Sequence, residues 1–470
     1  MEEGENSDAL AEHVTQGEWL TERAWEAKIR GSFTDLTCHR SSFPHRTDIC
    51  LVLRWYDTAS EQRVMEGVSK AVQLFNALTG RVEPFSPADG RTVRLYVCGV
   101  TPYDTTHMGH AMTYLVFDVF NRICQHHGWR VKYVQNITDI DDDILRKARE
   151  VGESWDRLGD RYIRQFQEDL NALNVLFPSV FPRATEEIPL MVEMIQRLLE
   201  QGAAYVRDGN VYFRVASDPD YGHLCRCRRE EMIRLSAERG ADPQDPRKED
   251  PLDFVLWQAA QPGEPTWDSP WGPGRPGWHI ECSAMAIKYL GPQIDVHGGG
   301  SDLIYPHHES EIAQSEGYTG LRPFSRFWVH VAMVEYQGAK MSKSLGNLVL
   351  VRDTLRRHTG DAIRLYLLSH HYRTPFAYED DGPARFEPLV QRLREAVNAV
   401  GGQATPLDLA PLRDELAAAL SDDLDTPRAI TVLAEAADRL LAAAREGRDV
   451  EHAREQLREM GGLIGLTVTR

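Results

Sequence analysis

The stretch between Arg94 and Val134 constrains the fold most, because its apolar pattern changes from that of a strand to that of a helix and back. Residues 94–100 alternate toward apolar side chains, as in a buried strand. Apolar residues follow at helical spacing over 110–124, and residues 130–134 have a second strand pattern. A strand, a helix and a strand in this order predict a βαβ unit, in which the strands are parallel. We therefore predict an α/β fold with a Rossmann-like, doubly wound parallel sheet.

Helical patterns dominate most of the remaining chain. They cover residues 156–173 and 186–201 and, toward the C-terminus, residues 389–400, 412–420, 428–444 and 450–460. The C-terminal group predicts a helical bundle. Residues 240–276 are instead rich in Pro, Gly, Asp and Trp. We predict a structured insertion there, because Phe254, Trp257 and Trp271 require burial.

Composition excludes several classes of protein. The formal net charge of −18 argues against indiscriminate binding of nucleic acid, which depends on a basic surface. No apolar run approaches the roughly 20 residues that span a bilayer, so we expect no membrane partner. The seven cysteines follow no disulfide spacing and the N-terminus is acidic, which together favour a cytoplasmic protein. Cys225 and Cys227 are too close in sequence for a good zinc clamp, and we interpret them as a chance pair.

Two short motifs could act on a nucleotide. His107-Met108-Gly109-His110 lies where the first strand gives way to the helix, so free N–H groups and the positive helix end suit a phosphate there. Lys340-Met341-Ser342-Lys343-Ser344 offers two cations to the charge that develops on pyrophosphate. Each motif alone has a plainer interpretation, as a helix start or a solvated charged loop. In this order they favour ATP chemistry, with His107, His110, Lys340 and Lys343 as catalytic residues.

A glycine-rich turn follows at His297-Gly298-Gly299-Gly300-Ser301-Asp302-Leu303. It could be a plain loop. In a nucleotide-binding fold its glycines allow adenine to approach the backbone, and Asp302 can bind a ribose or a substrate ammonium. We predict that ATP contacts Gly109, Gly298, Gly299, Gly300, Asp302 and Lys343.

Four further residues have the ligand types of a zinc site: Cys98, Cys282, His307 and Glu311. His307 and Glu311 are four residues apart and so share one face of a helix. Two thiolates, an imidazole and a carboxylate make a tetrahedral set. A lone cysteine is more often a small buried apolar group, and only the combination with the ATP motifs favours a metal site here.

Residues 96–378 closely resemble cysteinyl-tRNA synthetases and the related cysteine ligase of mycothiol synthesis. The supporting runs are Asn136–Asp142, Gly274–Met285, Tyr305–Glu309 and Lys340–Asn347. The two ATP motifs resemble the paired signatures of class I synthetases, with Met108 in place of the usual isoleucine. The resemblance implies one Zn²⁺ per chain on the four residues above, with ATP and Mg²⁺ as the nucleotide substrate. It also implies that L-cysteine binds the metal through its thiolate, beside Thr101, Thr138 and Trp278.

The resemblance also implies a division into domains. We expect an N-terminal extension of unknown role over 1–75 and a class I catalytic domain over 76–345, with a connective insertion at about 186–276. A stem-contact region would cover 346–395 and a helical bundle 396–470. The anticodon-reading domain that usually follows is expected to be absent. No editing domain is expected either, because zinc binds a soft thiolate far better than the hydroxyl of serine.

The acceptor of the cysteinyl group stays open between two enzymes. Glu311, His297 and the run Asp253–Trp257 resemble the tRNA enzymes, whereas Thr101–Asp104 and Ala237–Gly240 resemble the mycothiol ligase. We expect a monomer that transfers cysteine to tRNA(Cys). The alternative acceptor is the amine of glucosaminyl-inositol, and a non-catalytic paralogue that binds cysteine or nucleotide is a third possibility. If tRNA is the acceptor, phosphate contacts are expected from Arg352, Arg356, Arg357, Arg364 and Arg373.

Overall fold

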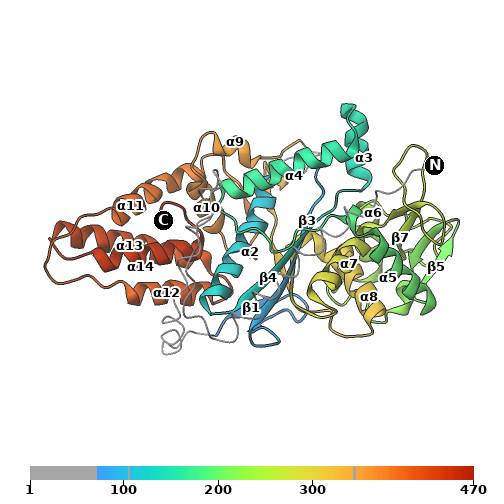
Figure 1. Cartoon of the computed structure of the whole chain (residues 1–470), viewed down its shortest axis with the longest axis horizontal. Helices are drawn as coiled ribbons and strands as arrows, with labels where there is room; N and C mark the ends of the chain where they lie inside the picture. The colour runs from blue at the N-terminus through green and yellow to red at the C-terminus, as the bar shows by residue number, and fades with distance from the viewer. Residues whose placement is uncertain (1–70, 104–105, 342–345, 470) are drawn as a thin grey trace, which may run out of the picture. The chain divides into compact units, whose positions relative to one another are not determined.

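The computed structural model describes residues 71–103, 106–341 and 346–469, and every structural statement below concerns these residues. A parallel sheet in the order β10-β9-β3-β4 forms their centre (Figure 1). Its strands are β3 (Thr92–Val100), β4 (Arg130–Ile137), β9 (Ile294–Gly300) and β10 (Ser325–Val331). The predicted α/β sheet and the βαβ unit over 94–134 are confirmed.

Alternate residues of β3 point to opposite faces of the sheet and divide the apolar core in two. Leu95 and Val97 pack with helix α2 (Met108–His126) on one face. Tyr96 and Cys98 pack on the other face with helix α7 (Trp278–Leu290). All four side chains are buried, so both faces of the sheet are covered, as a doubly wound fold requires.

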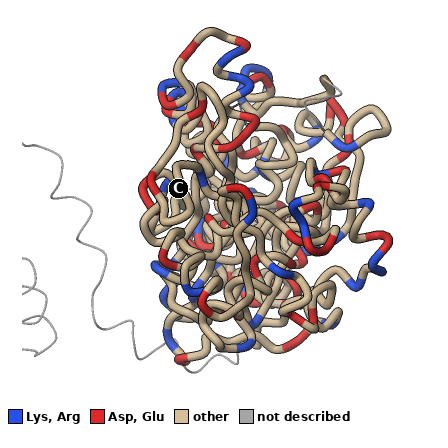
Figure 2. Tube along the Cα trace, turned by 90° about the vertical axis from the view of Figure 1, so that its right-hand side faces the viewer, with Lys and Arg blue, Asp and Glu red and all other residues tan. Residues whose placement is uncertain are grey.

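The predicted insertion folds around its own antiparallel sheet. The strands are β5 (Ala204–Arg207), β6 (Asn210–Phe213), β7 (Phe254–Ala259) and β8 (Gly274–Pro276), in that order across the sheet. Helices α5 (Ile188–Glu200) and α6 (Arg229–Glu238) belong to the same segment. Phe254 and Trp257 are buried, as predicted, and Trp271 is half-buried with its ring 6.0 Å from that of Trp257. Figure 2 shows basic and acidic residues interspersed along the trace on this side.

The C-terminal helices pack into the predicted bundle, which continues the core beneath α2. They are α11 (Glu387–Val397), α12 (Ala410–Leu420), α13 (Thr426–Arg445) and α14 (Glu451–Ile464). Leu416, Leu433 and Leu457 are fully buried between them. The 3.6-residue spacing of apolar positions located each of these helices to within a few residues.

The other elements surround the sheet and join it to the bundle. They are β1 (Gln73–Asn76), β2 (Arg81–Pro84), α3 (Asp142–Val151), α4 (Trp155–Ala172), α8 (Glu309–Thr319), β11 (Val334–Tyr336), β12 (Ala339–Lys340), α9 (Val351–Leu355), α10 (Gly360–Leu368) and β13 (Phe376–Ala377). Five short turns complete them: η1 (Ala184–Glu186), η2 (Val215–Ser217), η3 (Ser301–Leu303), η4 (Ile304–His308) and η5 (Pro383–Phe386). Strand β1 crosses the predicted boundary at 75, and α11 crosses the one at 395.

One predicted phosphate contact is wrong. The side chain of Arg364 is fully buried and bonded to the carboxylate of Asp118, which joins α10 to α2. Its guanidinium also donates to the carbonyl oxygen of Leu173 at 3.0 Å and to that of Ile464. An arginine in a helical sequence can lie on a solvated face or in a buried ion pair, and the sequence alone does not distinguish the two. Arg364 lies in a buried ion pair. In the described part of the chain, no helix combines the length and apolarity needed to cross a membrane.

Candidate active site

The carboxyl ends of the parallel strands open into a cavity of about 900 Å³, where α/β proteins bind their ligands. Twelve of the residues predicted from sequence line it: Cys98, Thr101, His107, Gly109, His110, Thr138, Trp278, Cys282, Gly300, Asp302, His307 and Lys340. Gly298, Gly299 and Glu311 are buried and do not line it. Lys343 lies outside the described residues. The strand ends therefore bring together side chains that are more than 200 residues apart in sequence, such as Cys98 and Lys340.

Helix α2 begins at the first motif, as predicted, and the His107 side chain caps it. Its Nδ1 accepts hydrogen bonds from the backbone N–H groups of Gly109 at 3.1 Å and His110 at 3.3 Å. The rings of His107 and His110 are stacked, with centroids 3.7 Å apart. A side chain on Gly109 would press against the His107 ring, so glycine keeps this helix start open toward the cavity. The arrangement suits a phosphoanhydride, because the positive end of the helix dipole and two imidazoles meet there.

The glycine turn divides into two parts with different environments. Gly298 and Gly299 are buried within β9, where a side chain would collide with Phe117 in the first case and with Leu303 and His308 in the second. Close packing of the chain therefore accounts for both glycines. Gly300 lines the cavity itself. Contact of ATP with Gly298 and Gly299 stays a prediction.

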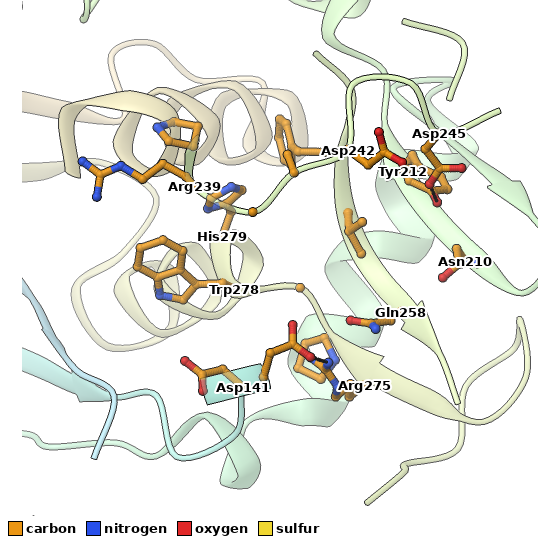
Figure 3. A pocket seen from close by; sticks show the side chains of 18 of the residues that line it. Asp141, Asn210, Tyr212, Arg239, Asp242, Asp245, Gln258, Arg275, Trp278 and His279 are labelled. Atoms are coloured by element: carbon orange, nitrogen blue, oxygen red, sulfur yellow. Dashed lines mark hydrogen bonds and ion pairs between the residues drawn. The ribbon is translucent and has the colours of Figure 1, made fainter. Parts of the chain in front are cut away.

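Asp302 carries the charge of this turn. Its Oδ2 lies 2.7 Å from Nζ of Lys340 and 3.6 Å from Nη1 of Arg239, a residue that Figure 3 labels. Burial opposes ionisation of Asp302, but the two cations, Lys340 first, lower its pKa below the ordinary value. The carboxylate is therefore charged at neutral pH, and it holds the first lysine of the second motif at the cavity wall.

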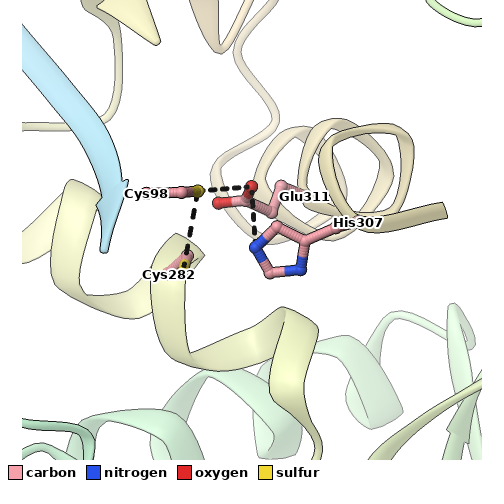
Figure 4. Close-up of side chains that lie close together, drawn as sticks. All are labelled: Cys98, Cys282, His307 and Glu311. Carbon is pink, nitrogen blue, oxygen red and sulfur yellow. Dashed lines mark hydrogen bonds and ion pairs between the residues drawn. The ribbon is translucent and has the colours of Figure 1, made fainter. Parts of the chain in front are cut away.

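Cys98, Cys282, His307 and Glu311 form a compact buried cluster (Figure 4). Cys98 Sγ lies 4.0 Å from Cys282 Sγ and 3.7 Å from Glu311 Oε2, and His307 Nε2 lies 3.4 Å from the same oxygen. Ligand atoms around a tetrahedral zinc are roughly 3.3–3.8 Å apart, given bonds of about 2.0–2.3 Å. Two of the three separations lie in this range and the sulfur–sulfur separation is slightly longer, so a small contraction around one zinc ion would complete the site.

The electrostatics of the cluster also favour a cation. Burial, followed by the neighbouring acidic groups, raises the pKa of Cys98 and Glu311, and burial lowers that of His307. His307 Nε2 and Glu311 Oε1 are buried without a hydrogen-bond partner in the described part of the chain. Such atoms are costly unless something satisfies them, and a divalent metal would satisfy both. His279 Nδ1 lies 2.9 Å from His307 Nδ1, which leaves Nε2 of His307 directed into the cluster.

A second possible ligand set overlaps the first. Cys98 and Glu311 also lie within reach of His297 and His308, with Cys98 Sγ 3.5 Å and 3.3 Å from their Nε2 atoms. Neither of these histidines lines the cavity, whereas Cys282 and His307 do. The first set also has two thiolates instead of one, and soft thiolate ligands suit zinc. Both differences favour the set predicted from sequence.

Thr101, Thr138 and Trp278 stand around the cluster, where the resemblance predicted the substrate. The Trp278 ring stacks on His307 with centroids 4.1 Å apart and remains 40% exposed. The Thr101 hydroxyl donates to Asp141 at 3.0 Å, and the Thr138 hydroxyl accepts from Asn136 at 3.2 Å. The aromatic face and the two oriented hydroxyls leave space for a small amino acid beside the ligand set.

Sequence analysis missed several residues of this site. His279 pairs with the ligand-set residue His307. His308 pairs with His330, and His308 Nδ1 lies 2.8 Å from His330 Nε2. Arg239 was noted only within a run of residues, although it reaches Asp302. His279, in the run around Cys282, was a usable signal, but its pairing with His307 depends on how α7 lies against η4, and the pairing of His308 with His330 depends on how η4 lies against β10.

Comparison with protein families identifies the catalytic region. Residues 84–384 match the family model described as "tRNA synthetases class I (C) catalytic domain". A "Cysteine--tRNA ligase" of Alkalilimnicola ehrlichii is 47% identical over 403 residues, which are 84% of this chain and 85% of that protein. An "L-cysteine:1D-myo-inositol 2-amino-2-deoxy-alpha-D-glucopyranoside ligase" of Thermomonospora curvata is 46% identical over 384 residues, or 81% of this chain and 91% of that one.

Solved structures agree on the fold. Methionyl-tRNA synthetase of Mycobacterium tuberculosis in complex with methionyl-adenylate superimposes with a TM-score of 0.56 at 16% identity. The match covers 80% of this chain and 91% of that chain. At this identity the likeness shows a shared fold.

Proposed function

The chain belongs to the class I tRNA synthetases of the cysteine-specific family, and from this premise we propose that it is an ATP-dependent cysteine--tRNA ligase. In the first half-reaction the carboxylate of L-cysteine attacks the α-phosphorus of ATP, which forms cysteinyl-adenylate and releases pyrophosphate. In the second, a terminal ribose hydroxyl of tRNA(Cys) attacks the cysteinyl carbonyl, and AMP leaves. The observation that carries the proposal is that His107, His110 and Lys340 line the same cavity as Cys98, Cys282 and His307.

Amino-acid selection would depend on the ligand set. Cys98, Cys282, His307 and Glu311 would hold Zn²⁺, which, when bound, supplies a soft Lewis acid that prefers a thiolate to a hydroxyl. Trp278, stacked on His307, would pack against the amino acid, and Thr101 and Thr138 would orient its polar groups. Packing alone distinguishes cysteine from serine poorly, so this chemistry would account for the selectivity.

Charge stabilisation would come from the two signature motifs. His107, His110 and the N-terminus of α2 would receive the phosphates of ATP, with Mg²⁺ as their counterion. Lys340 would then stabilise the charge that develops on pyrophosphate, together with Lys343. Asp302 would keep Lys340 at the cavity wall until the nucleotide binds. We further propose that the protein acts as a monomer in the cytoplasm.

A second candidate function shares the first half-reaction. The relative from Thermomonospora curvata is named for an amino-sugar acceptor, and Arg239 and Gly240, from the run that resembles that ligase, line the cavity. In this candidate the amine of glucosaminyl-inositol would attack cysteinyl-adenylate in place of the ribose hydroxyl.

Cysteine-dependent exchange between ATP and pyrophosphate tests the first half-reaction, with serine as the competing substrate. We expect exchange with cysteine and much weaker exchange with serine. The preformed adenylate is then offered tRNA(Cys) or glucosaminyl-inositol. Cysteinyl-tRNA as the product supports the proposal, a cysteinylated amino sugar supports the second candidate, and no exchange with cysteine rejects both.

A further inference from the structure

A second cavity of about 370 Å³ lies between the insertion and helix α7 (Figure 3). Its walls come from strands β6 and β7, from the segment after α6 and from the first turn of α7. Asn210, Tyr212, Asp245 and Gln258 line the side away from the catalytic sheet. No step of the proposed cysteine activation uses these residues, so the cavity has no role so far.

The second cavity adjoins the main one. Five residues line both: Asp141, Asp142, Arg239, Gly240 and Trp278. Trp278 stacks on His307 on the side of the main cavity and is 40% exposed. A molecule in the second cavity would therefore approach the ligand set past Trp278.

Glu281 indicates that the second cavity receives a hydrogen-bond donor. It lines this cavity, is fully buried, and neither carboxylate oxygen has a hydrogen-bond partner within the described residues, although the Thr138 hydroxyl approaches it. A buried carboxyl group without a hydrogen-bond partner is costly, so the native complex is expected to provide one. Hydroxyl and amine groups of a ligand are suitable donors.

The charges of the lining favour a neutral or weakly charged polar ring over a phosphate. Acidic and basic groups nearly balance: Asp141, Asp142, Asp242, Asp245 and Glu281 face Arg239, Arg247, Lys248 and Arg275. Several are already paired, since Arg275 bonds to Asp142 and Arg247 bonds to Asp245 at 2.8 Å. The Tyr212 hydroxyl donates to Asp245 at 3.0 Å. Polar side chains beside aromatic rings are suited to a sugar.

We infer that this second cavity holds the sugar ring of the cysteinyl acceptor. The inference rests on the proposed function and adds the location of its second substrate. The ring is a ribose if the acceptor is tRNA and a hexosamine if it is an amino sugar. Its hydroxyl or amine passes Trp278 and bonds to the cysteinyl carbonyl carbon. The mixed anhydride bond between the carbonyl carbon and the phosphate oxygen breaks, AMP leaves with the bonding electrons, and the proton of the nucleophile passes to the departing AMP or to solvent.

The test separates the two half-reactions in two variants, Gln258→Leu and Glu281→Gln. Gln196→Leu in α5 is the matched control, because Gln196 lines neither cavity. Exchange between ATP and pyrophosphate measures activation, and single-turnover transfer from preformed cysteinyl-adenylate measures the acceptor step. Both acceptors are offered, tRNA(Cys) and glucosaminyl-inositol. We expect exchange within twofold of the unaltered protein and transfer to the acceptor it uses lowered by about tenfold or more, the effect of one lost hydrogen bond.

Each other outcome is decisive. Unchanged transfer in both variants overturns the inference, and so does a loss of exchange in Gln258→Leu, because the cavity would then serve activation. Zinc content of Glu281→Gln is measured in parallel, since Cys282 is its neighbour in sequence. If the unaltered protein shows no exchange at all, the proposed function fails independently of this cavity.

Discussion

Nζ of Lys340 lies 2.7 Å from Oδ2 of Asp302, which joins the second signature motif to the glycine turn. The two residues come from β12 and η3 and meet at the wall of the main cavity. This pair holds the lysine close to where phosphates would bind, while the carboxylate satisfies its charge. An incoming ATP would compete with Asp302 for the ammonium group, so the pair is suited to a role that begins only when nucleotide is present.

Lys340→Ala should lower the rate of cysteine activation with little effect on cysteine binding. Removing one donor that stabilises transition-state charge costs about 10²–10³ in kcat. Steady-state exchange between ATP and pyrophosphate, at varied ATP and varied cysteine, measures both effects. Lys288→Ala is the matched control, because Lys288 forms a similar 2.7 Å ion pair with Glu187 away from the cavity. An exchange rate equal to that of the control would reject the role of Lys340.

Cys282→Ser should lose bound zinc and cysteine activation together. The hydroxyl of serine is a far weaker ligand than a thiolate, and Cys282 belongs only to the ligand set that faces the cavity. Metal content by mass spectrometry and exchange activity are measured on the same preparation. Cys225→Ser serves as the control, because Cys225 belongs to neither ligand set within the described residues. Full activity in a metal-free preparation would falsify the metal site.

The fold was largely predictable because its signals are local. The apolar period changes at the ends of β3, α2 and β4, and each C-terminal helix carries its own buried stripe. The ligand types of the metal cluster were also visible as residue types. Their convergence was not derivable from spacing, because Cys98 and Cys282 meet only when β3 and α7 pack together. The resemblance to a known family supplied that step.

Side-chain pairing over long sequence distances could not be predicted. Arg364 seemed suited to phosphate contacts, yet it pairs with Asp118 inside the core. Gly298 stays predicted as a nucleotide contact, and the ring of Phe117 adds a packing reason for glycine at that position. In both cases the residue type fits two roles, and the neighbour that matters is distant in sequence.

Stability should fall in mild acid through His127, at the end of α2. Burial, followed by the charge of His126, lowers the pKa of His127 from 6.5 to about 4. The unfolded chain therefore binds a proton between these values that the folded chain does not, so this contribution is present above pH 6.5 and is lost as pH falls to 4. His127→Gln should remove about 1–2 kcal/mol of that pH dependence.

Urea unfolding of His127→Gln between pH 4 and pH 7.5 measures this effect. The amide of glutamine can keep the contact with Ser421, whose hydroxyl lies 3.0 Å from Nε2 of His127. His452→Gln, at an exposed position of α14, should retain the pH dependence of the unaltered protein. Parallel curves for His127→Gln and the unaltered protein would contradict the assignment.

Substitutions at Arg357 and at Arg364 should have different effects, because we expect a phosphate contact from the first and find a structural ion pair at the second. Arg357 is exposed after α9, whereas Arg364 is fully buried against Asp118. If tRNA is the acceptor, Arg357→Ala should reduce the slope of log affinity against log salt by roughly 0.7–0.9 and leave stability nearly unchanged. Arg364→Met should instead cost about 1.5–3 kcal/mol in urea unfolding, because it leaves the buried carboxylate of Asp118 with Arg122 as its remaining cation, 2.9 Å away. Titrations of tRNA binding at several salt concentrations measure the slope. If a folded Arg364→Met protein showed an altered slope, Arg364 would contribute to tRNA binding and its purely structural role would be contradicted.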